Sequence, residues 1–204
     1  MRIELHYLPT IEYFVLLKKY QSVEIDIAEF YQKQSYRNRC YILGANKTQL
    51  LTIPVKDGNK RIQTKDIQID YNQKWLNVHL RAIQSAYGKA PFFEYYFDYF
   101  NDIFVRKEKY LVDLNYAMLS LCLKLLQFDS VLEKVEKYLD ESQQVDNQYI
   151  NVVNRKQNAS ERDIYQPYAY QQLFGNKFVP NLSIIDLLFC EGPGSSAIVG
   201  LSTV

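Results

Sequence analysis

The 204 residues are 48% hydrophobic and 23% charged, an ordinary globular composition that excludes the disordered and fibrous classes. The 24 basic and 23 acidic residues leave a net charge of +1, which argues against nucleic acid or an anionic membrane as a partner of the whole surface. The length predicts a single domain, residues 1–204, with a core large enough to need no disulfide or structural metal.

A strand–helix–strand unit is expected at the start of the chain. Apolar and polar residues alternate over 3–7 and again over 23–27, which predicts two short strands. A helix is expected between them, from Thr10 to about Tyr20. Because a helix connects the two strands, we expect them to pair in parallel.

Two hairpin signals follow. The turn sequence at 44–47 separates strands expected at 37–43 and 48–55. Asp57 and Gly58 then separate the second of these from a further strand expected at 61–70. Antiparallel pairing at both turns would make the N-terminal sheet a mixed one.

Helical periodicity begins near Gln73, with an apolar face that ends at Gly88 and consists of Leu76, Leu80, Ile83 and Tyr87. A second helix is expected from 92, and its aromatic residues over 92–100 surround the whole helix. Two interpretations stay open for these rings, namely packing in the core and stacking against a base or a sugar.

The apolar run over 110–128 is long enough to suggest a membrane span. It contains Asp113 and Lys124, and charges at the centre of a span are costly. We therefore expect a buried core helix there and no membrane span.

The last third of the chain mixes polar and apolar segments. Residues 131–138 fit a strand and a helix equally well, and the polar stretch at 140–163 predicts a long surface loop or lid. A last apolar helix is expected over 182–189, ending at 192–194. Together these elements predict an α/β fold in a single domain, with a mixed, mostly N-terminal β-sheet and packing helices.

Several familiar chemical signatures are absent from the sequence. Three widely spaced cysteines, an odd number, indicate buried thiols in a reducing compartment, and the first residues carry no secretory pattern, so we expect a cytoplasmic protein. Two histidines without paired cysteines match no zinc pattern, so no metal ligands are assigned. The glycine-rich phosphate loops and the GxSxG nucleophile motif are also missing.

Residues 31–40 form a basic block without a single acidic residue. On a strand, Arg37 and Arg39 share one face, so their guanidinium groups could converge on a phosphate or a carboxylate. Lys33 and Lys56 could join them, because Lys56 follows the strand expected to pair with theirs. The alternative is a solvated strand edge. The candidate binding residues of this region are Lys33, Gln34, Tyr36, Arg37, Asn38, Arg39 and Lys56.

Three titratable side chains are candidates for catalysis. His6 ends the first strand, where open α/β sheets place their ligands, so it is a candidate base; the alternative is a surface histidine bonded to a neighbour. His79 lies beside an apolar helix face and is either a base or a core histidine with a hydrogen-bonded ring. Asp66 is the third candidate.

Several stretches of the sequence together resemble the WbqC-like protein family. The block at 33–39 is the most specific of them, and the set covers nearly the whole chain. The stretches are HYLP at 6–9, YF at 13–14, KQSYRNR at 33–39, LTIPVK at 51–56, WLNVH at 75–79, YGKAPFF at 87–93 and PNLSIID at 180–186. Tyr87, in one of them, completes the candidate substrate-binding set.

The resemblance implies a role in bacterial surface polysaccharides. The family occurs in gene clusters for O-antigen and related polymers, and transfer of glycine or another aminoacyl group to a sugar has been suggested for it. For this chain the resemblance therefore implies a transferase whose cationic side chains bind a phosphorylated or nucleotide-linked sugar. The alternative is a non-catalytic ligand- or protein-binding module of the same pathway. The residues point to no particular donor, cofactor or oligomeric state.

Overall fold

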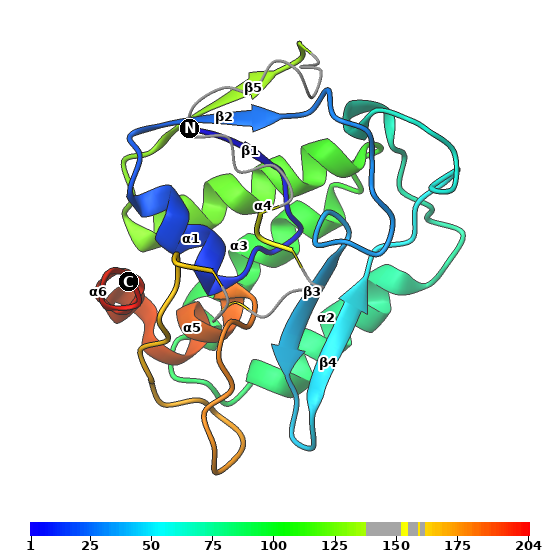
Figure 1. The fold of residues 1–204 in the computed structure, drawn as a ribbon. Helices are drawn as coiled ribbons and strands as arrows, with labels where there is room; N and C mark the ends of the chain where they lie inside the picture. The colour runs from blue at the N-terminus through cyan, green and yellow to red at the C-terminus, as the bar shows by residue number, and fades with distance from the viewer. Residues whose placement is uncertain (138–151, 155–158, 160–161) are drawn as a thin grey trace.

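The computed structural model describes residues 1–137, 152–154, 159 and 162–204, and the chain begins with a β–α–β unit (Figure 1). β1 (Arg2–Glu4) leads through α1 (Ile11–Lys18) to β2 (Ser22–Asp26), and the two strands pair in parallel as predicted. β5 (Val131–Val135) pairs with β2 on its other side, also in parallel, so the sheet order is β1–β2–β5. The segment that fitted both a strand and a helix is thus a strand.

The antiparallel pairing lies in a second sheet. β3 (Arg39–Leu43) and β4 (Thr48–Thr52) form the first predicted hairpin around its turn at 44–47. The strand expected at 61–70 is wrong: this region contains η1 (Thr64–Asp66), and its pairing across the second turn is reduced to one bridge between Val55 and Ile69. Pro54 explains the interruption, because proline has no N–H to extend the β4 ladder.

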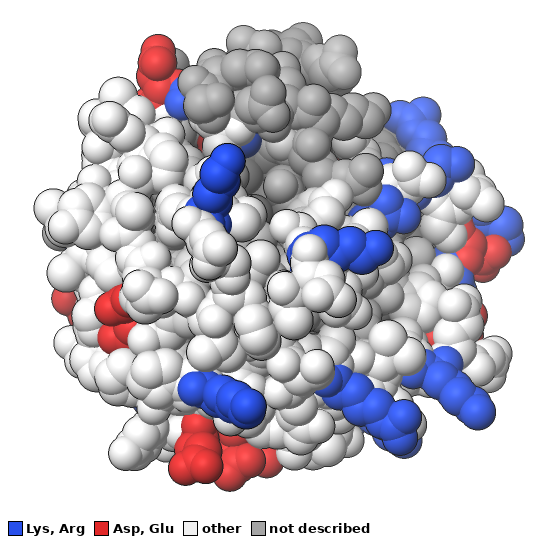
Figure 2. All heavy atoms as spheres, turned by 90° about the horizontal axis from the view of Figure 1, so that it is seen from below, with Lys and Arg blue, Asp and Glu red and all other residues white. Residues whose placement is uncertain are grey.

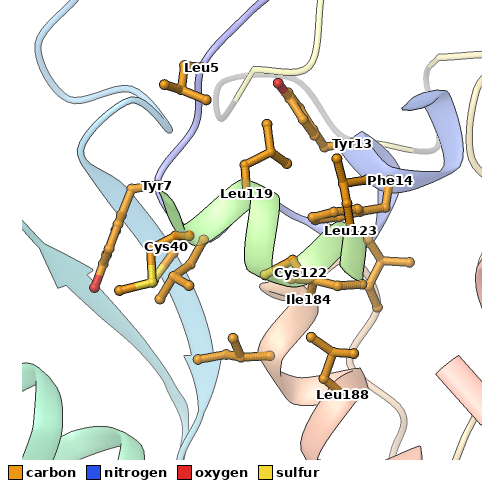
Figure 3. Close-up of a cluster of buried hydrophobic side chains, with 14 of the residues drawn as sticks. Leu5, Tyr7, Tyr13, Phe14, Cys40, Leu119, Cys122, Leu123, Ile184 and Leu188 are labelled. Carbon is orange, nitrogen blue, oxygen red and sulfur yellow. The ribbon is translucent and has the colours of Figure 1, made fainter. Parts of the chain in front are cut away.

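α4 (Leu111–Leu126) is the central helix of the core. Figure 3 shows its side chains meeting residues from the chain after β1, from α1, from β3 and from α5 (Ile184–Glu191). α2 (Trp75–Tyr87) and α3 (Phe93–Val105) complete the helical part before α4. The central position confirms that the apolar run at 110–128 is a core helix.

The predicted C-terminal helix ends where expected, as α5 at Glu191, but a further helix that was not predicted follows it. After α5 the chain turns through η3 (Gly192–Gly194) and continues as α6 (Ser195–Leu201). Gly192 has φ of +52°, and a β-carbon there would collide with the ring of Phe92, so glycine is needed at this close approach. The segment Ile184–Leu201 is long and apolar enough to cross a membrane, but 56% of it is buried inside the protein, as in an ordinary core helix.

Two further expectations concern the cysteines and the polar loop. All three cysteines, Cys40, Cys122 and Cys190, are buried free thiols, as predicted. Burial raises the pKa of each thiol, which makes the thiolate scarce at neutral pH. The loop or lid expected at 140–163 lies mostly outside the described residues.

Candidate functional site

The segment that follows β1 is held by hydrogen bonds to two distant parts of the chain. The N–H of Tyr7 donates to the Tyr36 carbonyl at 2.8 Å, and the Ser183 hydroxyl donates to the Leu8 carbonyl at 2.8 Å. Leu8 has φ of +41°, a conformation that is uncommon for leucine. The stretches at 6–9, 33–39 and 180–186, distant in sequence, therefore meet at the carboxyl end of β1.

His6 lies at this meeting point. Its side chain is 1% exposed, and its ring lies 4.8 Å from that of Tyr13 and 5.4 Å from that of Tyr36, centroid to centroid. The Nε2 atom is 3.1 Å from Oε1 of Glu4. The Nδ1 atom is buried and has no hydrogen-bond partner within the described part of the chain.

The charge states of this pair follow from burial and contact. Burial, together with the charge of Arg37, lowers the pKa of His6 more than the neighbouring acids raise it, so the imidazole is neutral at physiological pH. Burial alone would raise the pKa of Glu4, but the hydrogen bond from His6 and the charge of Arg37 outweigh it and lower that pKa. In the resulting tautomer Nε2–H donates to the Glu4 carboxylate, and Nδ1 carries a lone pair.

Arg37 lies between the carboxylates of Glu4 and Glu29. Its guanidinium donates to both oxygens of Glu29, at 2.6 and 2.5 Å, and lies 3.9 Å from Oε1 of Glu4. The Thr64 hydroxyl also donates to Glu29, at 3.2 Å. Arg37 is 2% exposed, so its charge interacts with buried partners and not with solvent. The network His6–Glu4–Arg37–Glu29 is therefore a continuous buried polar chain.

The side chains of the basic block at 31–40 do not form the single anion-binding site that the sequence predicted. Arg37 faces its acidic partners, whereas Lys33 and Gln34 are exposed beside a depression and Lys56 is exposed outside it. The expected convergence of all four cations is corrected here, because Glu29, eight residues before Arg37, takes the arginine into the interior.

Other members of the block have structural roles. The Asn38 side chain donates to the Ile53 carbonyl at 2.8 Å, which joins the entry of β3 to the end of β4. Arg39 is half-buried, and its Nε has no partner among the described residues. Burial raises the pKa of Tyr31 to about 12, although the charges of Arg37 and Arg39 act in the opposite direction. Tyr36 contacts His6, as described above.

His79 is a hydrogen-bonded core histidine. It is buried, as we expected, with Nε2 3.1 Å from the Thr52 carbonyl and Nδ1 3.0 Å from the Tyr7 hydroxyl. Burial lowers its pKa to about 4, so Nε2–H donates and Nδ1 accepts. Both ring nitrogens are occupied, which leaves no atom for a substrate proton.

Tyr87 and Asp66 lie away from His6. The Tyr87 hydroxyl is buried, accepts the N–H of Leu43 at 3.2 Å and donates to Asp186 at 2.9 Å. Asp66 is exposed on η1 and forms no hydrogen bond with either histidine within the described part of the structure. The three catalytic candidates of the sequence analysis are therefore not brought together.

Sequence reasoning missed the acidic members of the network, Glu4 and Glu29, and the flanking Tyr13. It also missed a second buried ion pair, in which Arg162 donates to both oxygens of Glu12, at 2.5 and 2.6 Å. One signal was available for Glu4. Because parallel strands in α/β folds are covered on both faces, polar residues that alternate along such a strand must be buried and paired.

The fold and this network define an α/β protein with a buried imidazole–carboxylate pair at the carboxyl end of a parallel strand. The sequence model of the WbqC-like protein family matches residues 5–162 and 160–198, nearly the whole chain. The chain therefore belongs to the WbqC-like protein family, as the resemblance predicted. No curated protein and no solved structure gives a significant match to it.

Proposed function

We propose that this protein is a transferase that moves glycine or another aminoacyl group to a sugar during synthesis of O-antigen or another bacterial surface polysaccharide. The observation that carries the proposal is the Nδ1 atom of His6, which is buried and unpartnered among the described residues while Nε2 is engaged by Glu4. Family membership supports the biological context.

His6 acts as the general base in this proposal. Its Nδ1 lone pair accepts the proton of the sugar amine or hydroxyl as that group attacks the acyl carbon. The bond between the acyl carbon and the carrier of the aminoacyl donor then breaks, and the imidazolium returns the proton to the departing carrier. Glu4 holds the ring in the required tautomer and stabilises the imidazolium that forms. Because the pKa of His6 is lowered, the base form persists below pH 6.5, and we expect activity to extend to mildly acidic pH.

The acceptor has to reach a ring that is 1% exposed. Tyr36, at 9%, is the more exposed of the two tyrosines that flank His6, since Tyr13 is fully buried. Displacement of the Tyr36 ring is therefore the route to Nδ1 that we propose. The acceptor is a phosphorylated or nucleotide-linked sugar, and the three buried free thiols support a reducing, cytoplasmic location.

A non-catalytic binding module of the same pathway is the second candidate. The near-complete burial of His6 and Arg37 favours it, because a buried polar network also serves simply to hold the fold.

Transfer assays on the purified full chain separate the two candidates. Nucleotide-linked sugars and amino sugars are combined with aminoacyl donors, and the product is followed by mass spectrometry. We expect His6→Gln to lower the rate about 100-fold or more, since a general base contributes about 10²–10⁴. His79→Gln is the matched control and should retain transfer in protein that stays folded. A His6→Gln rate within threefold of wild type would contradict the role of His6. If the wild type transfers no group with any donor, the binding module is the better function.

A further inference from the structure

An open depression lies beside the buried network, between residues 30–34 and 58–61. It has a volume of about 540 Å³ and is lined only by residues of these two segments. The lining contains the basic residues Lys33, Lys60 and Arg61 and no acidic residue. Figure 2, the view from below, shows basic side chains on the right with acidic ones among them.

Backbone contacts hold the two segments together. The N–H of Tyr31 donates to the Ile62 carbonyl at 2.9 Å, and Phe30 and Gln63 form an antiparallel bridge. A β-carbon at Gly58 would lie 2.9 Å from a methyl of Val55 and 3.4 Å from the Tyr31 ring, so glycine lets the turn rest on Tyr31. The depression is thus built on a fixed backbone.

The cations at its rim are positioned but not neutralised. Lys33 donates to the Asn59 side chain at 3.1 Å, and the guanidinium of Arg61 lies 4.1 Å from the centre of the Phe30 ring. Neither of these two has an acidic partner in the described residues. Lys60 lies 2.8 Å from Asp57, but both side chains are more than half exposed, so water and salt weaken the pair.

We propose that this depression binds the diphosphate group of a nucleotide-linked ligand. Cations on two facing segments suit an anion with two adjacent charged groups, whereas a carboxylate would engage only one segment. Amide groups of Gln32 and Asn59 supply further donors at the rim.

Tyr31 connects the depression to the candidate site. It lines the depression, and Glu29, two residues before it in the chain, pairs with Arg37, which lies 3.9 Å from Glu4. A ligand anchored by its diphosphate would therefore lie next to the segment that carries Glu29 of the network. The class of ligand is that of the proposed function, on which this assignment rests.

Calorimetry on the full chain at low salt tests the proposal with inorganic pyrophosphate and phosphate as probes. The site variant combines Lys33→Gln, Lys60→Gln and Arg61→Gln. The control variant combines Lys19→Gln, Lys89→Gln and Lys177→Gln, three exposed lysines outside the depression, so both lose the same charge. We expect wild type to bind pyrophosphate about tenfold more tightly than phosphate, the site variant to bind it about 100-fold more weakly than wild type, and the control to stay within about threefold.

Asp57→Asn provides an opposite test. It removes the acid beside Lys60, so pyrophosphate should bind about two- to threefold more tightly. The proposal is overturned if wild type binds no pyrophosphate, if phosphate binds equally well, or if the control variant loses as much affinity as the site variant. Pyrophosphate binding without any transfer activity would support the depression as a diphosphate site and contradict the proposed transferase activity. If the site variant transfers the group with unchanged rate and KM, the transferase activity is supported and the depression is not the diphosphate site.

Discussion

The two histidines show how hydrogen bonding separates structural from chemical roles at a single residue. Both rings are buried and neutral, because burial lowers the pKa of each. His79 uses both nitrogens within the fold, at Tyr7 and Thr52. His6 uses only Nε2, at Glu4, and its Nδ1 lacks a partner in the part of the chain described. His6 is therefore the ring with an atom available for chemistry.

His79 should make the stability of the protein depend on pH. Its pKa is about 4 in the folded chain and 6.5 in the unfolded chain, so below pH 6.5 the unfolded state binds a proton that the folded state does not. Stability is thus lost as the pH falls from about 6.5 to about 4, by about 3 kcal/mol in total. Urea unfolding at several pH values measures this loss. His79→Gln should make the dependence less steep over the same window, with His6, whose pKa is also lowered, still contributing, and an unchanged slope in the variant would contradict the assignment.

The candidate site was only partly predictable from single residues. His6 and Arg37 stand out in the sequence because of their type and local surroundings. Their partners do not, since Glu29 looks like an ordinary surface acid and Glu4 like the polar half of an alternating strand. Whether a cation is free or paired depends on residues brought near by the fold, so an acid-free stretch of sequence does not establish an open basic cradle.

At the scale of elements, most of the fold followed from periodicity and turn signals. The parallel unit, the first hairpin, and helices α2, α3 and α4 all lie where the pattern placed them. The failures have local causes. Pro54 interrupts the second hairpin, and the turn at 192–194, where Gly192 lies close to Phe92, is followed by the helix α6 that was not predicted. A glycine–proline turn can end a helix or redirect it, and only tertiary contacts decide which.

The hydroxyl of Tyr87 connects three elements of the fold, and a second prediction follows from its hydrogen bonds. From α2 its hydroxyl bonds the N–H of Leu43 on β3 and the carboxylate of Asp186 on α5. Tyr87→Phe leaves the Leu43 N–H without its acceptor and removes one of the donors to a buried acid, so we expect a loss of about 1–3 kcal/mol in unfolding free energy. Because the hydroxyl faces the interior, ligand binding by the folded variant should equal that of wild type. Weakened binding without a stability loss would restore Tyr87 as a substrate contact.

At the scale of the whole molecule, one buried charge cluster closes the N-terminal unit and a second joins that unit to the C-terminal third. Arg2 on β1 pairs with Asp26 on β2 at 2.7 Å and closes the parallel unit. On the far side of the same unit, Glu12 of α1 accepts from Arg162 and, at 2.9 Å, from the side chain of Asn181. The second cluster joins residues 150 positions or more apart, so the C-terminal third depends on an acid in the first helix.

The Glu12–Arg162 pair supports the last prediction. Glu12 is fully buried, so Arg162→Met leaves a buried carboxylate without its cation and should lower the unfolding free energy by about 3–5 kcal/mol. Adding Glu12→Gln to the Arg162→Met variant removes the unpaired charge, while Asn181 can still form a hydrogen bond with the new amide. The double variant should therefore be more stable than Arg162→Met alone, a reversal that a double-mutant cycle of urea unfolding would measure as strong coupling. Additive losses would mean that the two side chains act independently, and that packing of the Arg162 stem, not charge pairing, joins the C-terminal third to α1.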